Sequence, residues 1–165
     1  MIVMQAYLAG GPVMYLLTIL SIVAVALILY SIFRLHSMRS RRAEWQELAL
    51  AFLQESGDGE AAATRAVQRA SFRLQSAIHW LSRLAGMATL LGLLGTVLGI
   101  SQAFADMQAT GQAGPDVFAA GIYEALHTTI AGLLLALPFL LAHHLLRDAL
   151  SLRQLELLSS LGKRA

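Results

Sequence analysis

The chain of 165 residues contains no cysteine, only three prolines and few charged residues, at 13% of the total. The absence of cysteine excludes a disulfide framework and a metal site built from thiolates. The low charge, together with 57% hydrophobic residues, excludes an ordinary soluble domain and is typical of a small integral membrane protein. The sequence has no zinc-protease, hydrolase-nucleophile or P-loop motif, so we expect neither an enzyme nor a bound cofactor or metal.

Charge is missing altogether from three long runs of about 22 residues each, at 12–33, 84–105 and 125–146. A hydrocarbon core of roughly 30 Å requires about 20 apolar residues per helix. We therefore expect an all-α, single membrane domain over residues 1–165 with three transmembrane helices, at about 12–33, 84–106 and 117–146. The first run has no basic segment before it and ends in arginines, so we expect it to remain as a helix and not to be removed as a signal peptide.

Basic residues are also absent from the N-terminus and from the loop between the second and third runs. All 12 lie in two segments: Arg34, Arg39, Arg41, Arg42, Arg65, Arg69, Arg73 and Arg83 in the first, and Arg147, Arg153, Lys163 and Arg164 in the second. Such segments are cytoplasmic, which predicts an N-out, C-in topology. The sequence pI of about 9.4 then reflects topology and contact with anionic membrane lipid, and nucleic acid is not implied.

The two basic segments are expected to form helices that extend into the cytoplasm. In the segment 34–83, apolar residues recur at helical spacing from Trp45 to Leu53, a turn follows at 56–59, and a second helix then runs directly into the second span. This hairpin is too small to have an independent core. The tail 147–165 continues the third helix toward Leu158, and a compact turn is expected at 108–115.

Glu124 is the one carboxylate expected inside a span, roughly 10 Å below its outer end. A buried intramembrane acid is costly and by default marks a functional site, often an ion or proton path. His127 lies three residues later on a neighbouring part of the face. It is either a second titrating group, as histidine often is near neutral pH, or a neutral ring that orients the acid. His143 and His144 are expected at the inner interface, with metal binding as the less favoured reading.

Hydroxyl and small residues fill the second and third spans. Thr96 and Thr129 fall at similar mid-membrane depth, roughly 18 Å from the ends of their spans, and with Thr128 they are candidates for a proton relay. They could instead bond carbonyls of their own helices. Small residues let helix backbones approach closely in lipid, which predicts packing faces at Gly92, Gly95, Gly99, Gly121 and Gly132. Pro138 is expected to kink or loosen the third helix.

Three stretches resemble the ExbB/TolQ/MotA family of proton-channel subunits, most closely its ExbB and TolQ branch. They are the segment 90–100 (LLGLLGTVLGI), the segment from Gly121 to Pro138, and the entry to the first helix at 10–15. The resemblance implies a pentameric ring around single-span ExbD/TolR-like helices that carry an intramembrane Asp. It also places Thr96 at the pore lining and maps the third-helix acid and threonine to Glu124 and Thr129.

The resemblance implies a proton-channel, stator-like subunit of a bacterial inner-membrane motor. Such a motor would use the proton motive force to energise an envelope process such as TonB-dependent import, through a TonB/TolA-like protein. The alternative is a non-conducting homo-oligomeric scaffold or holin-like assembly. Three departures from the family stand out: Ala88-Thr89 replaces an Ala-Pro pair, His127 stands where an aliphatic residue is usual, and the cytoplasmic hairpin is short. Glu124 and Thr129 lie about 140° apart around the helix, and which of them faces the lumen stays open.

Overall fold

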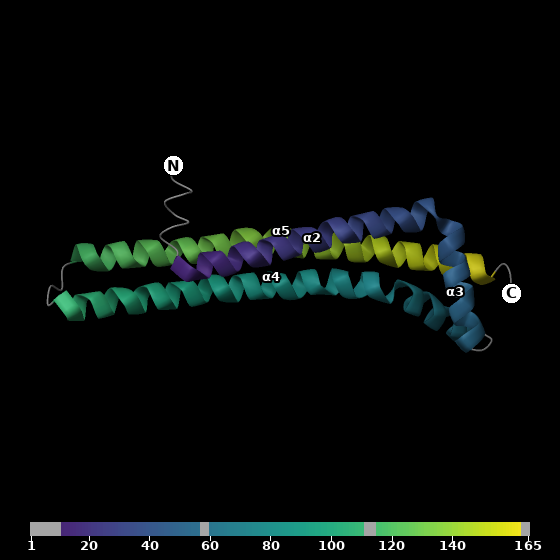
Figure 1. Ribbon diagram of the computed structural model, residues 1–165, viewed down its shortest axis with the longest axis horizontal. Helices are drawn as coiled ribbons and strands as arrows, with labels where there is room; N and C mark the ends of the chain where they lie inside the picture. The colour runs from purple at the N-terminus through teal and green to yellow at the C-terminus, as the bar shows by residue number, and fades with distance from the viewer. Residues whose placement is uncertain (1–10, 57–59, 111–114, 163–165) are drawn as a thin grey trace. The chain divides into compact units, whose positions relative to one another are not determined.

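The computed structural model describes residues 11–56, 60–110 and 115–162, which are helical apart from a turn at Arg41. The elements are α2 (Gly11–Ser40), α3 (Arg42–Ser56), α4 (Glu60–Thr110) and α5 (Pro115–Gly162), in the chain order drawn in Figure 1. Three of them, α2, α4 and α5, are long and apolar enough to cross a membrane. The predicted all-α architecture with three long apolar helices is confirmed.

The helices are longer than the apolar runs that predicted them. The second helix of the hairpin continues without a break into the apolar run, so that α4 is one helix of 51 residues. The third run continues through Pro138 and past Arg147 to the end of α5 at Gly162. The amphipathic segment around Trp45 forms α3, with Glu44 in its first turn, where an acidic side chain favours the positive end of the helix dipole.

The turn expected at 108–115 overlaps helix at both of its ends. Helix α4 continues to Thr110, because Met107, Gln108 and Ala109 are all good helix formers. Helix α5 already begins at Pro115, since proline at the first helical position loses no helical hydrogen bond. Residues 111–114 and the expected turn at 57–59 lie outside the described residues.

The chain divides into two compact units, and each contains parts of α2, α4 and α5. The first unit comprises Met1–Val25 and Ser82–Leu140, and the second comprises Ala26–Leu81 and Leu141–Ala165. In the first unit α4 and α5 lie side by side (Figure 1), with alanines and glycines at their contact. The second unit buries larger side chains from the same two helices, among them Leu74, Ile78 and Leu81.

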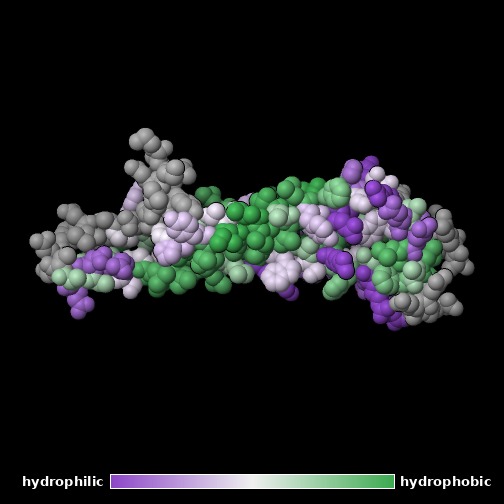
Figure 2. Space-filling view, in the orientation of Figure 1, coloured by the Kyte–Doolittle hydropathy of each residue, from purple (hydrophilic) through white to green (hydrophobic). Residues whose placement is uncertain are grey.

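Most of the apolar surface of the three long helices is left uncovered by the chain itself. Only 22%, 28% and 28% of the most apolar windows of α2, α4 and α5 are buried. Figure 2 shows hydrophobic side chains gathered along α2 and hydrophilic ones around α3. Since large exposed apolar surfaces are not stable in water, these faces require lipid or other helices around them.

Candidate functional site

The contact between α4 and α5 in the first unit consists of small residues that bring two backbones together. A Cβ atom added to Gly132 would lie 2.5 Å from the carbonyl oxygen of Ala88 and 3.0 Å from the Cα of Gly92. A Cβ added to Gly92 would lie 2.9 Å from the carbonyl oxygen of Thr128. There is thus no room for a side chain at either position.

The same close contact continues toward the start of α5. A Cβ added to Gly99 would lie 2.9 Å from the Cβ of Ala125, and one added to Gly121 would overlap the Cβ of Ala103. We call this set of residues the glycine seam: Ala88, Gly92, Gly95, Gly99 and Ala103 on α4, and Gly121, Ala125, Thr128, Thr129 and Gly132 on α5. All five glycines predicted to pack helices lie in it.

Two threonine hydroxyls of α5 meet one backbone carbonyl of α4 within the glycine seam. Thr129 Oγ1 donates to the carbonyl oxygen of Gly92 at 3.0 Å. Thr128 Oγ1 lies 3.1 Å from the same oxygen and 2.7 Å from the carbonyl oxygen of Ala125, and its single hydrogen is shared between these two acceptors. The approach depends on glycine, because a Cβ at Gly95 would overlap the Thr128 side chain. Hydrogen bonds between helices in apolar surroundings add to their association.

Thr96 lies four residues after Gly92 on α4 but binds within its own helix. Its hydroxyl donates to the carbonyl oxygen of Leu93 at 2.6 Å, and the side chain is half-buried. The alternative in which threonines bond their own helix therefore applies to Thr96 and, in part, to Thr128. Each of these hydroxyls keeps lone pairs that can accept a hydrogen bond from water, so none of them is excluded from a hydrated path.

His127 is held by the preceding turn of α5. Its Nδ1 lies 2.7 Å from the carbonyl oxygen of Tyr123, and its ring packs edge-on against the Tyr123 ring, with centroids 4.5 Å apart. A carbonyl only accepts hydrogen bonds, so Nδ1 carries the hydrogen and Nε2 remains for another partner. The backbone at Glu124 is helical, but its side chain lies outside the described part, and the pairing of Glu124 with His127 stays a prediction.

The threonine hydroxyls lie close in the sequence to two titratable side chains. Hydroxyls fixed on carbonyls can relay hydrogen bonds, and the same stretch of α5 contains the carboxylate of Glu124 and the imidazole of His127. Among the described residues, no group of three or more His, Cys, Asp or Glu side chains could hold a metal ion.

Sequence reasoning missed three features of the structure. It did not identify Ala103 as the partner of Gly121, although Ala103 continues the small-residue spacing from Gly92 to Gly99. It expected His143 at the inner membrane interface but did not predict that His143 would be buried, with its Nδ1 donating to the carbonyl oxygen of Ile78 at 2.8 Å. It gave no sign that the carbonyl of Gly92 would accept two hydroxyls, because a backbone acceptor leaves no signature in a sequence.

The chain is similar to several characterised proteins over about half of its length. It is 41% identical over 73 residues to the biopolymer transport protein exbB1 of Vibrio cholerae, and this alignment covers 44% of this chain and 32% of that protein. It is 42% identical over 78 residues to the biopolymer transport protein ExbB of Xanthomonas campestris, an alignment that covers 47% of this chain and 31% of the relative. It is 35% identical over 79 residues to the Tol-Pal system protein TolQ of Haemophilus influenzae, an alignment that covers 48% of this chain and 35% of the relative.

These matches cover about a third of each relative's own length. The family signature covers much more of this chain, because the profile of the MotA/TolQ/ExbB proton channel family matches residues 34–157. The matched region contains all of α3 and α4, most of α5 and the whole glycine seam. Together with the three apolar helices, this match establishes that the chain is a membrane protein belonging to the MotA/TolQ/ExbB proton channel family.

Proposed function

We propose that this chain is the channel subunit of a bacterial inner-membrane complex that uses the proton motive force to energise an envelope process. The observation that carries the proposal is Glu124, the one carboxylate in the apolar residues 117–146 of α5, within the region that matches the proton channel family. The role is transport and not catalysis. A proton that crosses the membrane releases about 2.3 kcal/mol per 100 mV, which is enough to bias a mechanical step.

In this proposal the chain lies N-out and C-in and forms a homo-oligomer, with five copies by family resemblance. The uncovered apolar faces of α2, α4 and α5 are then available to lipid and to neighbouring subunits. A single-span ExbD/TolR-like helix with an intramembrane Asp completes the proton path, and Glu124 exchanges protons with it. A TonB/TolA-like protein receives the mechanical output.

A non-conducting scaffold is the competing function, and one observation favours it. The hydroxyls of Thr128 and Thr129 already bond the opposite helix, which is all that a packing role requires. In a scaffold Glu124 would only bond a neighbouring helix, and its substitution would disturb assembly before it disturbed proton flux.

The test is proton flux through the full chain, co-purified with the product of a neighbouring gene that encodes a single-span protein and reconstituted in liposomes. We expect Glu124→Gln and Glu124→Ala to lower the flux by more than about tenfold, because neither an amide nor a methyl group can exchange the proton. Assembly, measured as the native mass of the complex, should be unchanged. The matched control is Asp148→Asn, the same kind of exchange at an exposed acid outside the apolar run, which should leave the flux unchanged.

Two outcomes would count against the proposal. Normal flux in Glu124→Gln at normal membrane levels would remove the carboxylate from the proton path. Loss of the oligomer in both Glu124 variants, with the control intact, would support the scaffold instead.

A further inference from the structure

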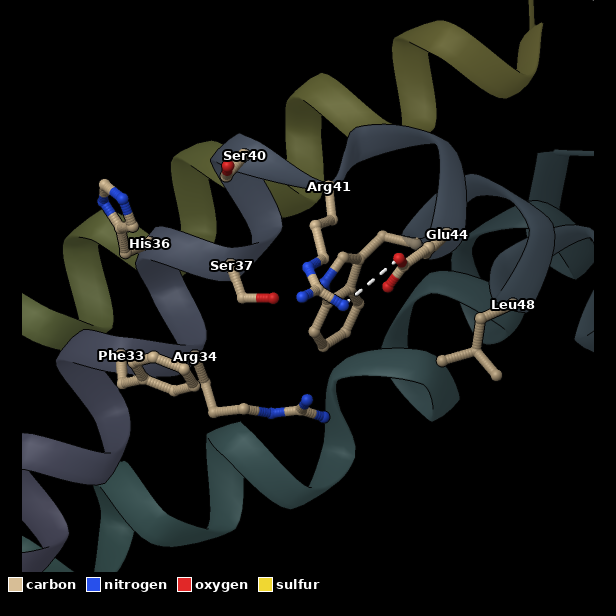
Figure 3. Close-up of a pocket in the computed structure, with 9 residues that line it drawn as sticks. Phe33, Arg34, His36, Ser37, Ser40, Arg41, Glu44 and Leu48 are labelled. Atoms are coloured by element: carbon tan, nitrogen blue, oxygen red, sulfur yellow. Dashed lines mark hydrogen bonds and ion pairs between the residues drawn. The ribbon is translucent and has the colours of Figure 1, made fainter.

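A pocket of about 550 Å³ lies between the end of α2 and the start of α3, within the second unit (Figure 3). Its lining combines polar and apolar side chains. The polar ones are Arg34, His36, Ser37, Ser40, Arg41 and Glu44, and the apolar ones include Phe33 and Leu48. A pocket that combines cations, hydroxyls and apolar walls suits an amphiphilic anion.

Arg34 is the cation in this pocket that lacks an acidic partner. Arg41 is paired with Glu44 at 3.3 Å, and Figure 3 shows this ion pair at the pocket. The described residues offer Arg34 no such carboxylate, and its buried Nε makes no hydrogen bond to any of them. A guanidinium without a carboxylate partner keeps its remaining charged N–H donors available to an oxyanion, so the pocket is better satisfied when an anion is bound.

Trp45 fixes the position of the Arg34 side chain. The guanidinium carbon lies 5.0 Å from the centroid of the Trp45 ring, within the range of a cation–π interaction. Trp45 itself is only 5% exposed, so it is a rigid support. A guanidinium held over a ring can still make a two-pronged contact with phosphate oxygens through its terminal N–H groups.

The pocket also lies where the apolar part of α2 ends. Phe33 is the last residue of the uncharged run and Arg34 is the first charge after it. Phe33 is 72% exposed, and one turn earlier Leu29 is 63% exposed. A ligand with its phosphate at Arg34 can therefore lay hydrocarbon chains along α2, which a soluble phosphate compound could not use.

We propose that this pocket binds the phosphate headgroup of an anionic phospholipid, with Arg34 as the anchoring cation and Ser37 and Ser40 as neutral hydrogen-bond donors. The acyl chains lie along the exposed apolar side chains of α2. This binding is independent of the proton path, since none of the pocket residues belongs to the glycine seam or to the stretch around Glu124.

The experiment uses the full-length protein in nanodiscs of phosphatidylcholine mixed with phosphatidylglycerol, followed by native mass spectrometry of the lipids it retains. The wild type should retain phosphatidylglycerol in preference to phosphatidylcholine. Arg34→Gln should lower this retention by about tenfold, the effect of losing a charged hydrogen bond, and Arg34→Lys should lower it less. The matched control is Arg39→Gln, which removes the same charge from an exposed position of α2 that does not line the pocket, and should change retention by less than about twofold.

Three results would overturn the proposal. Equal retention of the two lipids by the wild type would do so without any variant, and so would equal losses in Arg34→Gln and Arg39→Gln, which would indicate unspecific attraction. The third is displacement of the lipid by soluble glycerol phosphate at comparable concentration, which would assign the pocket to a soluble phosphate. The oligomeric mass of each variant is measured in the same spectra, so misfolding is recognised separately.

Discussion

The two units of this chain use the same two helices, α4 and α5, with opposite kinds of side chain. In the first unit the helices meet through the glycine seam, where a Cβ on Gly132 would approach a backbone oxygen to 2.5 Å. In the second unit these helices also bury large side chains, with Leu74 and Ile78 from α4 and Leu150 from α5. The difference follows from the surroundings that the sequence predicts for each.

In lipid, burying a leucine between helices gains little, because the acyl chains are as apolar as the side chain. Association there depends on close backbone contact and on polar bonds such as those of Thr128 and Thr129 to the Gly92 carbonyl. In water, removing leucines from solvent is the main driving force. The composition of a helix contact therefore indicates which solvent surrounds it.

The largest loss of stability should come from truncating a buried leucine of the second unit. Leu74→Ala should lower the free energy of unfolding by about 2–5 kcal/mol, because Leu74 is 1% exposed and its loss leaves a cavity. The measurement is denaturant unfolding of the purified chain in detergent, followed by circular dichroism. Leu155→Ala, at a position on α5 that is 61% exposed, is the control and should cost far less; equal losses would mean that the core is not where the structure places it.

The next largest loss of stability should come from adding one methyl group to the glycine seam. Gly132→Ala should destabilise the protein by about 1–3 kcal/mol, because the new Cβ meets backbone atoms of Ala88 and Gly92 that cannot rotate away. The control is Gly86→Ala on α4, where nothing lies within 4 Å of the added Cβ, and which should be neutral or slightly stabilising. Thermal unfolding of both variants in the same detergent measures the difference in stability. A Gly132→Ala protein as stable as the wild type would contradict the close backbone contact in the glycine seam.

A smaller loss is expected when a hydroxyl is removed from the seam. Thr129→Val should cost about 0.6 kcal/mol, the average for a hydrogen bond between membrane helices. Thr96→Val should cost less, since Thr96 bonds only its own helix. Unfolding experiments give the stability change, and proton flux measured on the same variants separates packing from conduction. Loss of flux without loss of the oligomer would place a hydroxyl in the path, whereas normal flux in both variants would remove the threonines from the mechanism.

The smallest change in stability is expected for His127, whose one hydrogen bond among the described residues is to the preceding turn of its own helix. His143→Leu should destabilise more than His127→Leu, since His143 joins α5 to the Ile78 carbonyl of α4. For conduction, we expect His127→Leu to lower proton flux evenly, or hardly at all, from about pH 5 to 8. A shifted pH profile would show instead that His127 titrates as a coupled pair with Glu124.

The sequence predicted the helices well because their signals are local. Missing charge indicated α2, α4 and α5, and helical spacing from Trp45 to Leu53 indicated α3. The family resemblance is also confirmed. Contacts between helices were harder to predict, because they depend on how each helix is rotated about its axis. The spacing of small residues indicated where α4 and α5 would meet, but it did not distinguish Thr128, which is buried in the seam, from half-buried Thr129.

The pairing of Arg34 with Trp45 was beyond prediction for a related reason. The two residues belong to different helices, and the turn at Arg41 sets the angle at which they meet. Nothing local in the sequence specifies that angle. The roles of Glu124, Thr96, Thr129, Thr128 and His127 in proton transfer remain predictions until flux is measured.

The glycine seam also changes the entropy of assembly. Glycine and alanine have no side-chain rotamers to lose, whereas each leucine fixed in a core gives up roughly 0.5–1 kcal/mol of rotamer freedom. Along the glycine seam α4 and α5 therefore come together with little ordering of side chains, and Thr128 and Thr129 supply directional contacts. Glycine and alanine offer no alternative rotamers through which the helices could repack, so we expect these parts of α4 and α5 to move as one stiff pair.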